Sequence, residues 1–123
     1  MRVLVCGSRE WDDYQAVWRF LAFLKPFDVV IHGAARGADM LADKVAQQRR
    51  CTVEAYPADW EQHGKRAGYL RNAEMLEKGR PDLVVGFGHG KGTDMMLKLA
   101  MQSGVRTYRV TAGHDVPDGG SDG

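Results

Sequence analysis

The chain has 123 residues, of which 44% are hydrophobic and 27% are charged, and its net charge is +1. These values fit a single globular domain that is large enough to bury a core. The longest apolar runs are too short to cross a membrane, and the first ten residues lack the apolar stretch of a signal peptide. We therefore expect a cytoplasmic protein with no membrane partner. The two cysteines, Cys6 and Cys51, predict neither a disulfide framework nor a metal site.

Short apolar strands alternate with helical patterns along the chain. The first, second and fourth strands are continuously apolar, which is typical of the centre of a parallel sheet. The third strand is mixed and the fifth alternates, so both are expected at the edges. The sequence thus predicts a Rossmann-like α/β fold, a three-layer sandwich with a five-stranded parallel sheet of order 3-2-1-4-5 and helices on both faces. The expected strands are 3–6, 29–31, 53–56, 83–87 and 105–110, and the expected helices are about 13–25, 40–50, 66–78 and 95–103.

Charge is unevenly distributed along the chain. Residues 111–123 contain three aspartates and no lysine or arginine, and we expect them to form a disordered acidic tail. The remaining residues, 1–110, form the predicted binding domain and hold 17 basic against 13 acidic residues, a net charge of +4. This charge suits an anionic small molecule. The chain lacks a lysine-rich track, so nucleic acid is not an expected partner.

Nine glycines lie at or near the crossings from a strand to the next helix. In a parallel sheet these crossings meet at one edge, where ligands of such folds bind. Helix N-termini present free N–H groups there, and glycine lets the backbone approach an anion closely. Any single glycine is equally well explained as a turn residue, but the set predicts a phosphate-binding edge, with Lys91 reaching the anion. The nine are Gly7, Gly33, Gly37, Gly64, Gly68, Gly86, Gly88, Gly90 and Gly92.

Polar side chains follow the same strands. Ser8 and Arg9 come directly after the first strand, where an arginine can bind phosphate through two hydrogen bonds or lie in a solvated turn. Asp39 either accepts hydrogen bonds from ribose hydroxyls or caps the second helix. Thr93 and Asp94, at the start of the last helix, leave the same alternatives open.

A long connection, PADWEQHGKRAG, precedes the third helix and is rich in hydrogen-bond donors. Loops of this length in compact domains are often lids or pocket walls. Trp60 or Tyr69 either stacks on a base or fills a hydrophobic gap. Arg71 and Asn72 are the strongest side-chain candidates in this part of the chain.

Four stretches resemble the SLOG superfamily, and within it the small YspA/YpsA-type branch of domains of unknown function. They are GSREW (7–11), HGAARGADMLA (32–42), YPADWEQHGKRAGYLRN (56–72) and FGHGKGTDMM (87–96). The resemblance implies a Rossmann-like domain over residues 1–110 that binds nucleotides or nucleotide-derived ligands. More distant relatives are the lonely-guy phosphoribohydrolases, which cleave the base–ribose bond of cytokinin nucleotides, and DNA-processing protein A.

The phosphoribohydrolases carry an R-K-x-x-M helix and a P-G-G-x-G-T-x-x-E loop. This chain resembles the helix at Arg71 and Met75, with Asn72 in place of the lysine. The position of the loop glutamate is Met96, so the carboxylate of the enzymes is replaced. If the protein is an enzyme, the resemblance implies a catalytic Arg71 with a substitute carboxylate from Asp39, Asp94 or Glu74. The loop itself keeps Gly90, Gly92 and Thr93, with Gly88 at the proline position.

The last helix is apolar on nearly every side. Lys98 is the only charge within residues 95–103. A helix with this pattern is buried on more than one side, and in a thin domain the second side can be another subunit. We therefore expect a homodimer through this helix, with Trp18 or other exposed aromatic side chains contributing.

These observations lead to three hypotheses of different classes. The favoured one is a sensor or signalling protein that binds a nucleotide or nucleotide-derived ligand without a cofactor or metal. The alternatives are an N-glycosidase acting on nucleoside monophosphates, and a protein that binds single-stranded DNA. The predicted ligand-binding residues are Gly7, Ser8, Arg9, Gly33, Arg36, Gly37, Asp39, Arg71, Asn72, Gly88, Gly90, Lys91, Gly92, Thr93 and Asp94.

Overall fold

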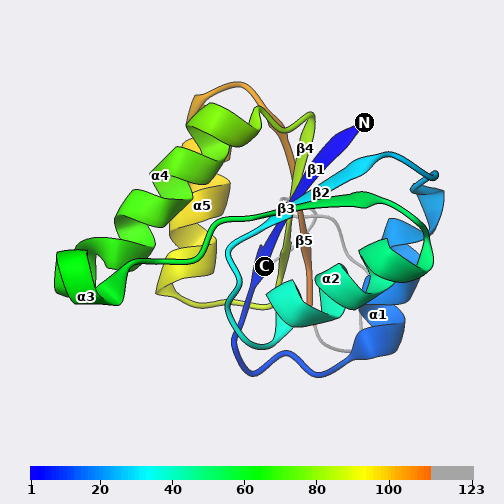
Figure 1. The fold of residues 1–123 in the computed structure, drawn as a ribbon, viewed down its shortest axis with the longest axis horizontal. Helices are drawn as coiled ribbons and strands as arrows, with labels where there is room; N and C mark the ends of the chain where they lie inside the picture. Colours follow the sequence, from blue (N-terminus) through cyan, green and yellow to red (C-terminus); the bar gives the residue numbers. More distant parts are fainter. Residues whose placement is uncertain (112–123) are drawn as a thin grey trace.

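The structure, a computed structural model, describes residues 1–111. The predicted acidic tail, apart from its first residue, lies outside the described residues. Five parallel strands form one sheet in the order β3-β2-β1-β4-β5, as predicted (Figure 1). The central strand pairs with β2 and β4, and Val3 lies opposite both Val30 and Leu83. The strands are β1 (Arg2–Gly7), β2 (Val29–His32), β3 (Thr52–Ala55), β4 (Leu83–Phe87) and β5 (Arg106–Val110).

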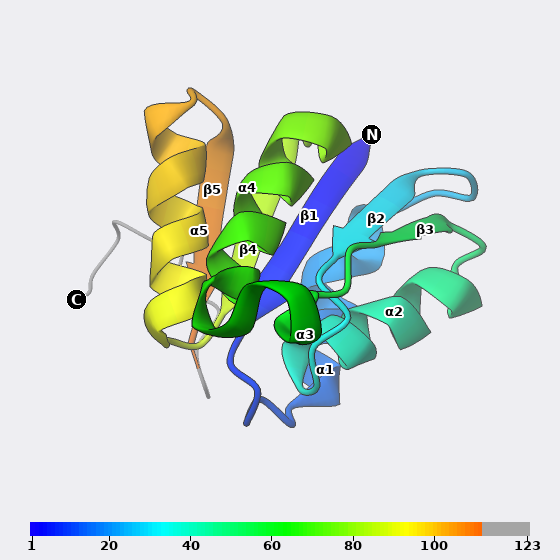
Figure 2. The ribbon, with the colours of Figure 1, turned by 60° about the vertical axis from the view of Figure 1, so that its left-hand side comes forward.

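Helices cover both faces of the sheet (Figures 1 and 2). One face is covered by α1 (Tyr14–Phe20) and α2 (Ala38–Gln48), and the other by α4 (Ala67–Gly79) and α5 (Lys91–Gln102). The short α3 (Trp60–His63) lies near the edge where the strands end. None of the helices within residues 1–111 is both long enough and apolar enough to span a membrane.

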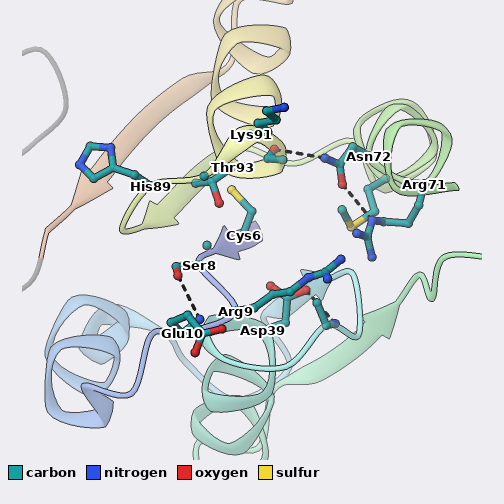
Figure 3. Close-up of a pocket in the computed structure, with 15 residues that line it drawn as sticks. Cys6, Ser8, Arg9, Glu10, Asp39, Arg71, Asn72, His89, Lys91 and Thr93 are labelled. Atoms are coloured by element: carbon teal, nitrogen blue, oxygen red, sulfur yellow. Dashed lines mark hydrogen bonds between the residues drawn. The ribbon is translucent and has the colours of Figure 1, made fainter. Parts of the chain in front are cut away.

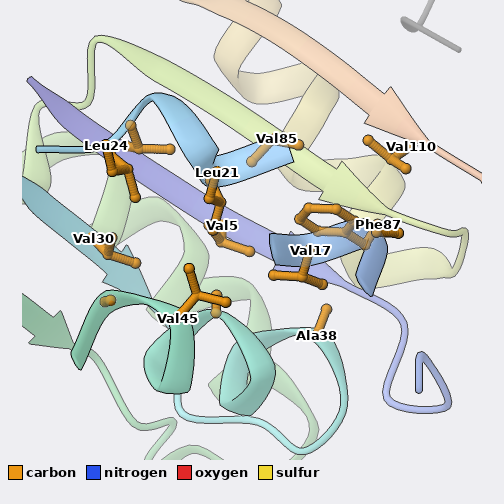
Figure 4. Packing of buried hydrophobic residues seen from close by; sticks show 14 of the residues in the cluster. Val5, Val17, Leu21, Leu24, Val30, Ala38, Val45, Val85, Phe87 and Val110 are labelled. Carbon is orange, nitrogen blue, oxygen red and sulfur yellow. The ribbon is translucent and has the colours of Figure 1, made fainter. Parts of the chain in front are cut away.

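Side chains of the central strand alternate between two cores. Val5 packs with Val17 and Val45 beneath α1 and α2 (Figure 4). Leu4 points to the opposite face and packs with Met75 and Met96 of α4 and α5. This alternation is the period-two pattern of a strand buried on both faces, so β1 anchors both layers of helices.

Two boundaries differ from the expected ones. The first helix ends at Phe20 and continues only as a 3₁₀ turn (Leu21–Phe23), and Leu24 is then extended, with a ψ of 141°, two residues before Pro26. The connection before α4 is not all loop, because it contains α3 and a second 3₁₀ turn (Gly64–Arg66). The Asp59 side chain caps α3 by accepting a hydrogen bond from Gln62 N at 3.0 Å.

The last helix has a buried face and an open face. Met96 and Leu97 are buried against the sheet and α4, whereas the side chain of Met101 is 53% exposed. Trp18 is half-buried rather than exposed, because it packs against Tyr14 and beneath the guanidinium of Arg49. The homodimer through α5 stays a prediction.

The burial of Met96 predicts how the chain responds to the glutamate of the phosphoribohydrolase loop. We expect Met96→Glu to lower the free energy of unfolding by about 3 kcal/mol, because it places a carboxyl group without a partner in the core. Met96→Leu, which keeps the volume, should cost less than about 1.5 kcal/mol. Urea unfolding of both variants measures the difference. Equal stability of the two would contradict the prediction and would mean that a carboxylate at position 96 reaches solvent.

Candidate functional site

A pocket of about 360 Å³ opens at the edge where β1 and β4 end. Its walls come from the loops after β1, β2 and β4 and from one side of α4, and their polar side chains face one another across it (Figure 3). Most of the predicted ligand residues meet here, which we call the first pocket. It is lined by Cys6, Gly7, Ser8, Arg9, Glu10, Ala35, Asp39, Arg71, Asn72, Met75, His89, Gly90, Lys91, Gly92 and Thr93.

A second pocket of about 360 Å³ adjoins the first. The two share Arg9, Ala35 and Arg71 as lining residues. The predicted residues Gly33 and Arg36 lie in this second pocket and not in the first. Its remaining walls are Ala34, Pro57, Ala58 and Trp60.

Three predicted residues line neither pocket but shape the loops around them. Gly37 has a φ of 81°, and a Cβ there would lie 2.4 Å from the carbonyl oxygen of Ser8. Gly88 has a φ of 84° and packs beside the ring of Trp11. Asp94 pairs with Arg109 at 2.9 Å.

The N-terminus of α5 opens into the first pocket. Its first intrahelical hydrogen bond runs from Asp94 N to Gly90 O at 2.8 Å, so the N–H groups of residues 91–93 have no acceptor within the helix. Gly90, the residue before the helix, has a φ of 144° and offers no capping side chain. A Cβ at Gly92 would meet no atom within 4 Å. This end of the helix can therefore accept an anion from the pocket side.

Arg109 on β5 fixes the loop that precedes α5. Its guanidinium donates to Gly88 O at 2.7 Å, lies 3.2 Å from His89 Nδ1, and pairs with Asp94. Arg109 was not among the predicted residues, because the alternation of β5 gives no information about contacts with another loop. The arginine holds the glycine loop in one conformation.

Arg71 and Asn72 connect three elements around the pocket. The guanidinium of Arg71 donates to the carbonyl of Gly33 and, through Nε, to Asn72 Oδ1 at 2.9 Å. Asn72 Nδ2 in turn donates to Gly92 O at 3.3 Å. Burial lowers the pKa of Arg71, which the charge of Asp39 partly opposes. Both side chains are thus held in place before any ligand binds.

Asp39 is a nearly buried carboxylate in the pocket wall, with 6% of its surface exposed. Its Oδ2 accepts hydrogen bonds from Gly33 N at 3.0 Å and Ala35 N at 3.2 Å. Asp39 therefore holds the loop after β2, rather than capping α2 through that helix's own N–H groups. Burial raises its pKa, although these hydrogen bonds and the charge of Arg71 act in the other direction.

Of the substitute carboxylates, only Asp39 lines the pocket. Glu74 pairs with Lys78 at 3.0 Å on the exposed side of α4, and Asp94 pairs with Arg109. Glu10 also lines the pocket and was missed, although it lies within the GSREW stretch; it pairs with Arg36 at 2.6 Å.

His32 lies behind the pocket wall and does not line it. Its Nδ1 accepts a hydrogen bond from Ala34 N at 3.0 Å, so Nε2 carries the proton and donates to Asp43 Oδ2 at 2.6 Å. The pKa of Asp43 is lowered: burial alone would raise it, but hydrogen bonds from His32 and Gln47 outweigh burial. This pair orders the loop that carries Gly33 and Ala35.

Cys6 and His89 also line the first pocket without having been predicted. Burial raises the pKa of the Cys6 thiol far above its usual value, so this sulfur stays protonated and is a poor nucleophile. Within residues 1–111, no group of three or more His, Cys, Asp and Glu side chains is placed to hold a metal ion.

The opposite pKa shifts of Asp39 and Asp43 predict opposite effects on stability. The folded state binds the Asp39 proton more tightly than the unfolded state does, so the contribution of Asp39 becomes less favourable as pH rises above its ordinary pKa of 3.8. We compare the free energy of unfolding of Asp39→Asn with that of the wild type. We expect this difference to favour the variant more at pH 7 than at pH 4. The contribution of Asp43 is present above pH 3.8 and is lost as pH falls through its lowered pKa, so Asp43→Asn should destabilise at pH 7.

Urea unfolding of both variants between pH 3.5 and pH 8 measures the two trends. A parallel pH dependence of the two variants would contradict the assignment.

The chain matches known proteins in sequence and in fold. Residues 1–63 match the family model described as the YspA, cpYpsA-related SLOG family. The Gene 61 protein of Mycobacterium phage D29 is 44% identical over an alignment of 115 residues, and this alignment covers 85% of this chain and 91% of that protein. DNA processing protein A (DprA) from Streptococcus pneumoniae has a similar structure, with a TM-score of 0.68 and 18% identity over 98% of this chain.

The match to DprA covers 53% of the DprA chain, so this chain spans about half its length. At this identity the likeness shows the fold alone, and the expectation that nucleic acid is not a partner stays a prediction. The family match carries more weight, because it covers about half of the chain. By this match, the chain belongs to the YspA, cpYpsA-related SLOG family.

Proposed function

We propose that the protein binds a nucleotide or nucleotide-derived small molecule and acts as a sensor or signalling protein. The observation that carries this proposal is the N-terminus of α5, where three consecutive N–H groups without intrahelical acceptors open into a pocket. Helix N-termini of this kind favour phosphate, because unpaired donors and the helix dipole act together. The open space at Gly92 leaves room for a phosphate to approach the backbone.

Cations around this helix end support an anionic ligand. Lys91 is exposed at the first position of α5, and Arg9, from the loop after β1, lines the same pocket. Arg9 forms no hydrogen bond or ion pair with any of residues 1–111, although it lies over the ring of Trp60. Its guanidinium is therefore available to a phosphate.

Acceptors on the opposite wall support a ribose beside the phosphate. Asp39 uses Oδ2 for the backbone of the loop after β2, and its Oδ1 has no partner within the described part of the chain. A carboxylate oxygen in this position can accept a hydrogen bond from a sugar hydroxyl. The proposed ligand thus has its phosphate at α5 and its sugar near Asp39.

Removal of the cation at the start of α5, compared with removal of a cation further along the helix, tests the phosphate position. We expect Lys91→Ala to weaken binding of nucleoside mono- and diphosphates about tenfold, because a charge-assisted hydrogen bond contributes roughly 1.5 kcal/mol or more. Lys98→Ala removes an exposed charge further along the same helix and should leave the affinity unchanged. Gly92→Val should abolish binding while the protein stays folded, since no atom lies within 4 Å of the added Cβ.

Thermal-shift screening across nucleotides, cyclic nucleotides and ADP-ribose identifies the ligand, and calorimetry then gives the affinities. If the two lysine variants lose affinity equally, general electrostatics and not the helix end accounts for binding. If no phosphorylated compound shifts the melting temperature, the proposal fails.

An N-glycosidase is the second candidate function, and Asp39 is the observation that favours it. A nearly buried carboxyl group with a raised pKa, next to an arginine in a pocket, is the type of group that serves as a general acid. In this role the protonated carboxyl would give its proton to the departing base, and the water that adds to the ribose carbon would return a proton to the carboxylate. Incubation with nucleoside monophosphates and chromatography of free base tests it. Release that is lost in both Arg71→Ala and Asp39→Asn would establish the hydrolase, and the absence of release would leave binding as the function.

A further inference from the structure

The second pocket combines an aromatic ring with three arginines, and none of its lining residues is acidic. It is joined to the first pocket through Arg9, Ala35 and Arg71. A ligand held at α5 can therefore extend into it without leaving the cleft. The inference below rests on the proposed function, because it assigns this adjoining space to the rest of the same ligand.

Trp60 is the exposed aromatic wall of the second pocket. About half of its surface, 49%, is accessible, although it is a large hydrophobic side chain. The ring is not loosely placed: a Cβ at Gly68 would lie 3.4 Å from its Cη2 atom, and the Arg9 guanidinium carbon lies 5.8 Å from its centroid. Its local fold also fixes it, because the capped turn of α3 begins at this residue.

The three arginines of this pocket differ in how they are engaged. Arg36 pairs with Glu10, and Arg71 donates to the carbonyls of Gly33 and Tyr56. The guanidinium of Arg9 lies over the ring of Trp60 and forms no hydrogen bond or ion pair within residues 1–111, so it can move without breaking one. Arg9 and Arg71 both line the two pockets, and of these two only Arg71 forms hydrogen bonds through its side chain with other residues that the structure describes.

We propose that the second pocket is a nucleobase subsite, in which a base stacks on Trp60 and Arg9 bridges the base and the phosphate at α5. Nucleobases are flat and present a π-face to any aromatic ring, and arginine guanidinium groups stack on the same surfaces. In this arrangement the sugar lies between the two pockets, next to Ala35, which lines both of them, and to Asp39, which lines the first. The ligand class is accordingly a nucleoside phosphate, and a sugar phosphate without a base fills only half of the cleft.

The experiment compares ligands that differ only in the base. We measure binding of the adenosine, guanosine, cytidine and uridine 5′-monophosphates and of ribose 5-phosphate by calorimetry and by tryptophan fluorescence. At least one monophosphate should bind ten or more times tighter than ribose 5-phosphate, in line with the contribution of one stacked base. Its binding should also quench fluorescence, because Trp60 is more exposed than Trp11, which is buried, and Trp18, which is half-buried.

Variants separate stacking from a structural role of the ring. Trp60→Leu should reduce the affinity for the monophosphate to within about threefold of that for ribose 5-phosphate and remove the quenching, whereas Trp60→Phe should keep most of the preference. Tyr69→Leu is the matched control, since Tyr69 is 55% exposed on α4 but lines neither pocket. The affinity for ribose 5-phosphate should be the same in all of these proteins.

Equal affinity of the wild-type protein for the monophosphates and ribose 5-phosphate would overturn the base subsite while leaving the proposed phosphate site intact. A loss of affinity for both ligand types in Trp60→Leu would also overturn it, because the ring would then act by supporting the fold. Tight binding only of compounds with a second phosphate, unaffected by Trp60→Leu, would mean that the arginines hold an anion instead of a base. Failure of every phosphorylated compound to bind would refute the proposed function itself.

Discussion

The site depends on the parallel pairing of β1 with β4 and on the backbone of one residue, Ser8, that follows it. Ser8 N donates to Phe87 O at 2.8 Å, and Ser8 O accepts from Ala38 N and Trp11 N, both at 3.2 Å. These bonds bring the end of β1, the end of β4 and the start of α2 to one point. Helix α2 lies on one face of the sheet and α5 on the other (Figure 1). Residues at the starts of both helices line the first pocket. The cleft is therefore a consequence of the strand order.

Two opposite charges are held at this cleft by one short segment of backbone. The peptide groups of Gly33 serve both: its N–H donates to Asp39, and its carbonyl accepts from Arg71. Partial burial of an arginine and nearly complete burial of a carboxylate both cost free energy, and neither side chain is needed to fill the hydrophobic core. Such groups in a cleft are more readily explained by a ligand than by stability. Both charged side chains are already held in place, so less conformational free energy is lost when a ligand binds to them.

Much of the fold could be predicted from the sequence, because apolar strands and glycine-rich crossings are local patterns. The sheet order followed from the burial of three strands, and the strand Leu83–Phe87 was placed correctly at both ends. The contacts of Arg109 could not be predicted, since they join β5 to a loop some 20 residues earlier and leave no periodic signal. The short helix α3 was missed for another reason. Its cap, Asp59 with Gln62 three positions on, is a recognisable signal, but four residues are too few to show helical periodicity.

The glycines in and around the loop that follows β4 form one pattern in the sequence, but they do not all have the same physical reason. Gly86 is favoured by packing, because a Cβ there would lie only 3.0 Å from side-chain atoms of both Thr93 and Leu97. Gly88 and Gly90 are favoured by positive φ angles of 84° and 144°. Gly92 has neither reason. It lies in the first turn of α5 with open space around it, where alanine would favour the helix by roughly 0.5–1 kcal/mol. A glycine that the backbone does not need and the helix disfavours, at the mouth of a pocket and beside unpaired N–H groups, is best explained by a ligand that must come close to the chain.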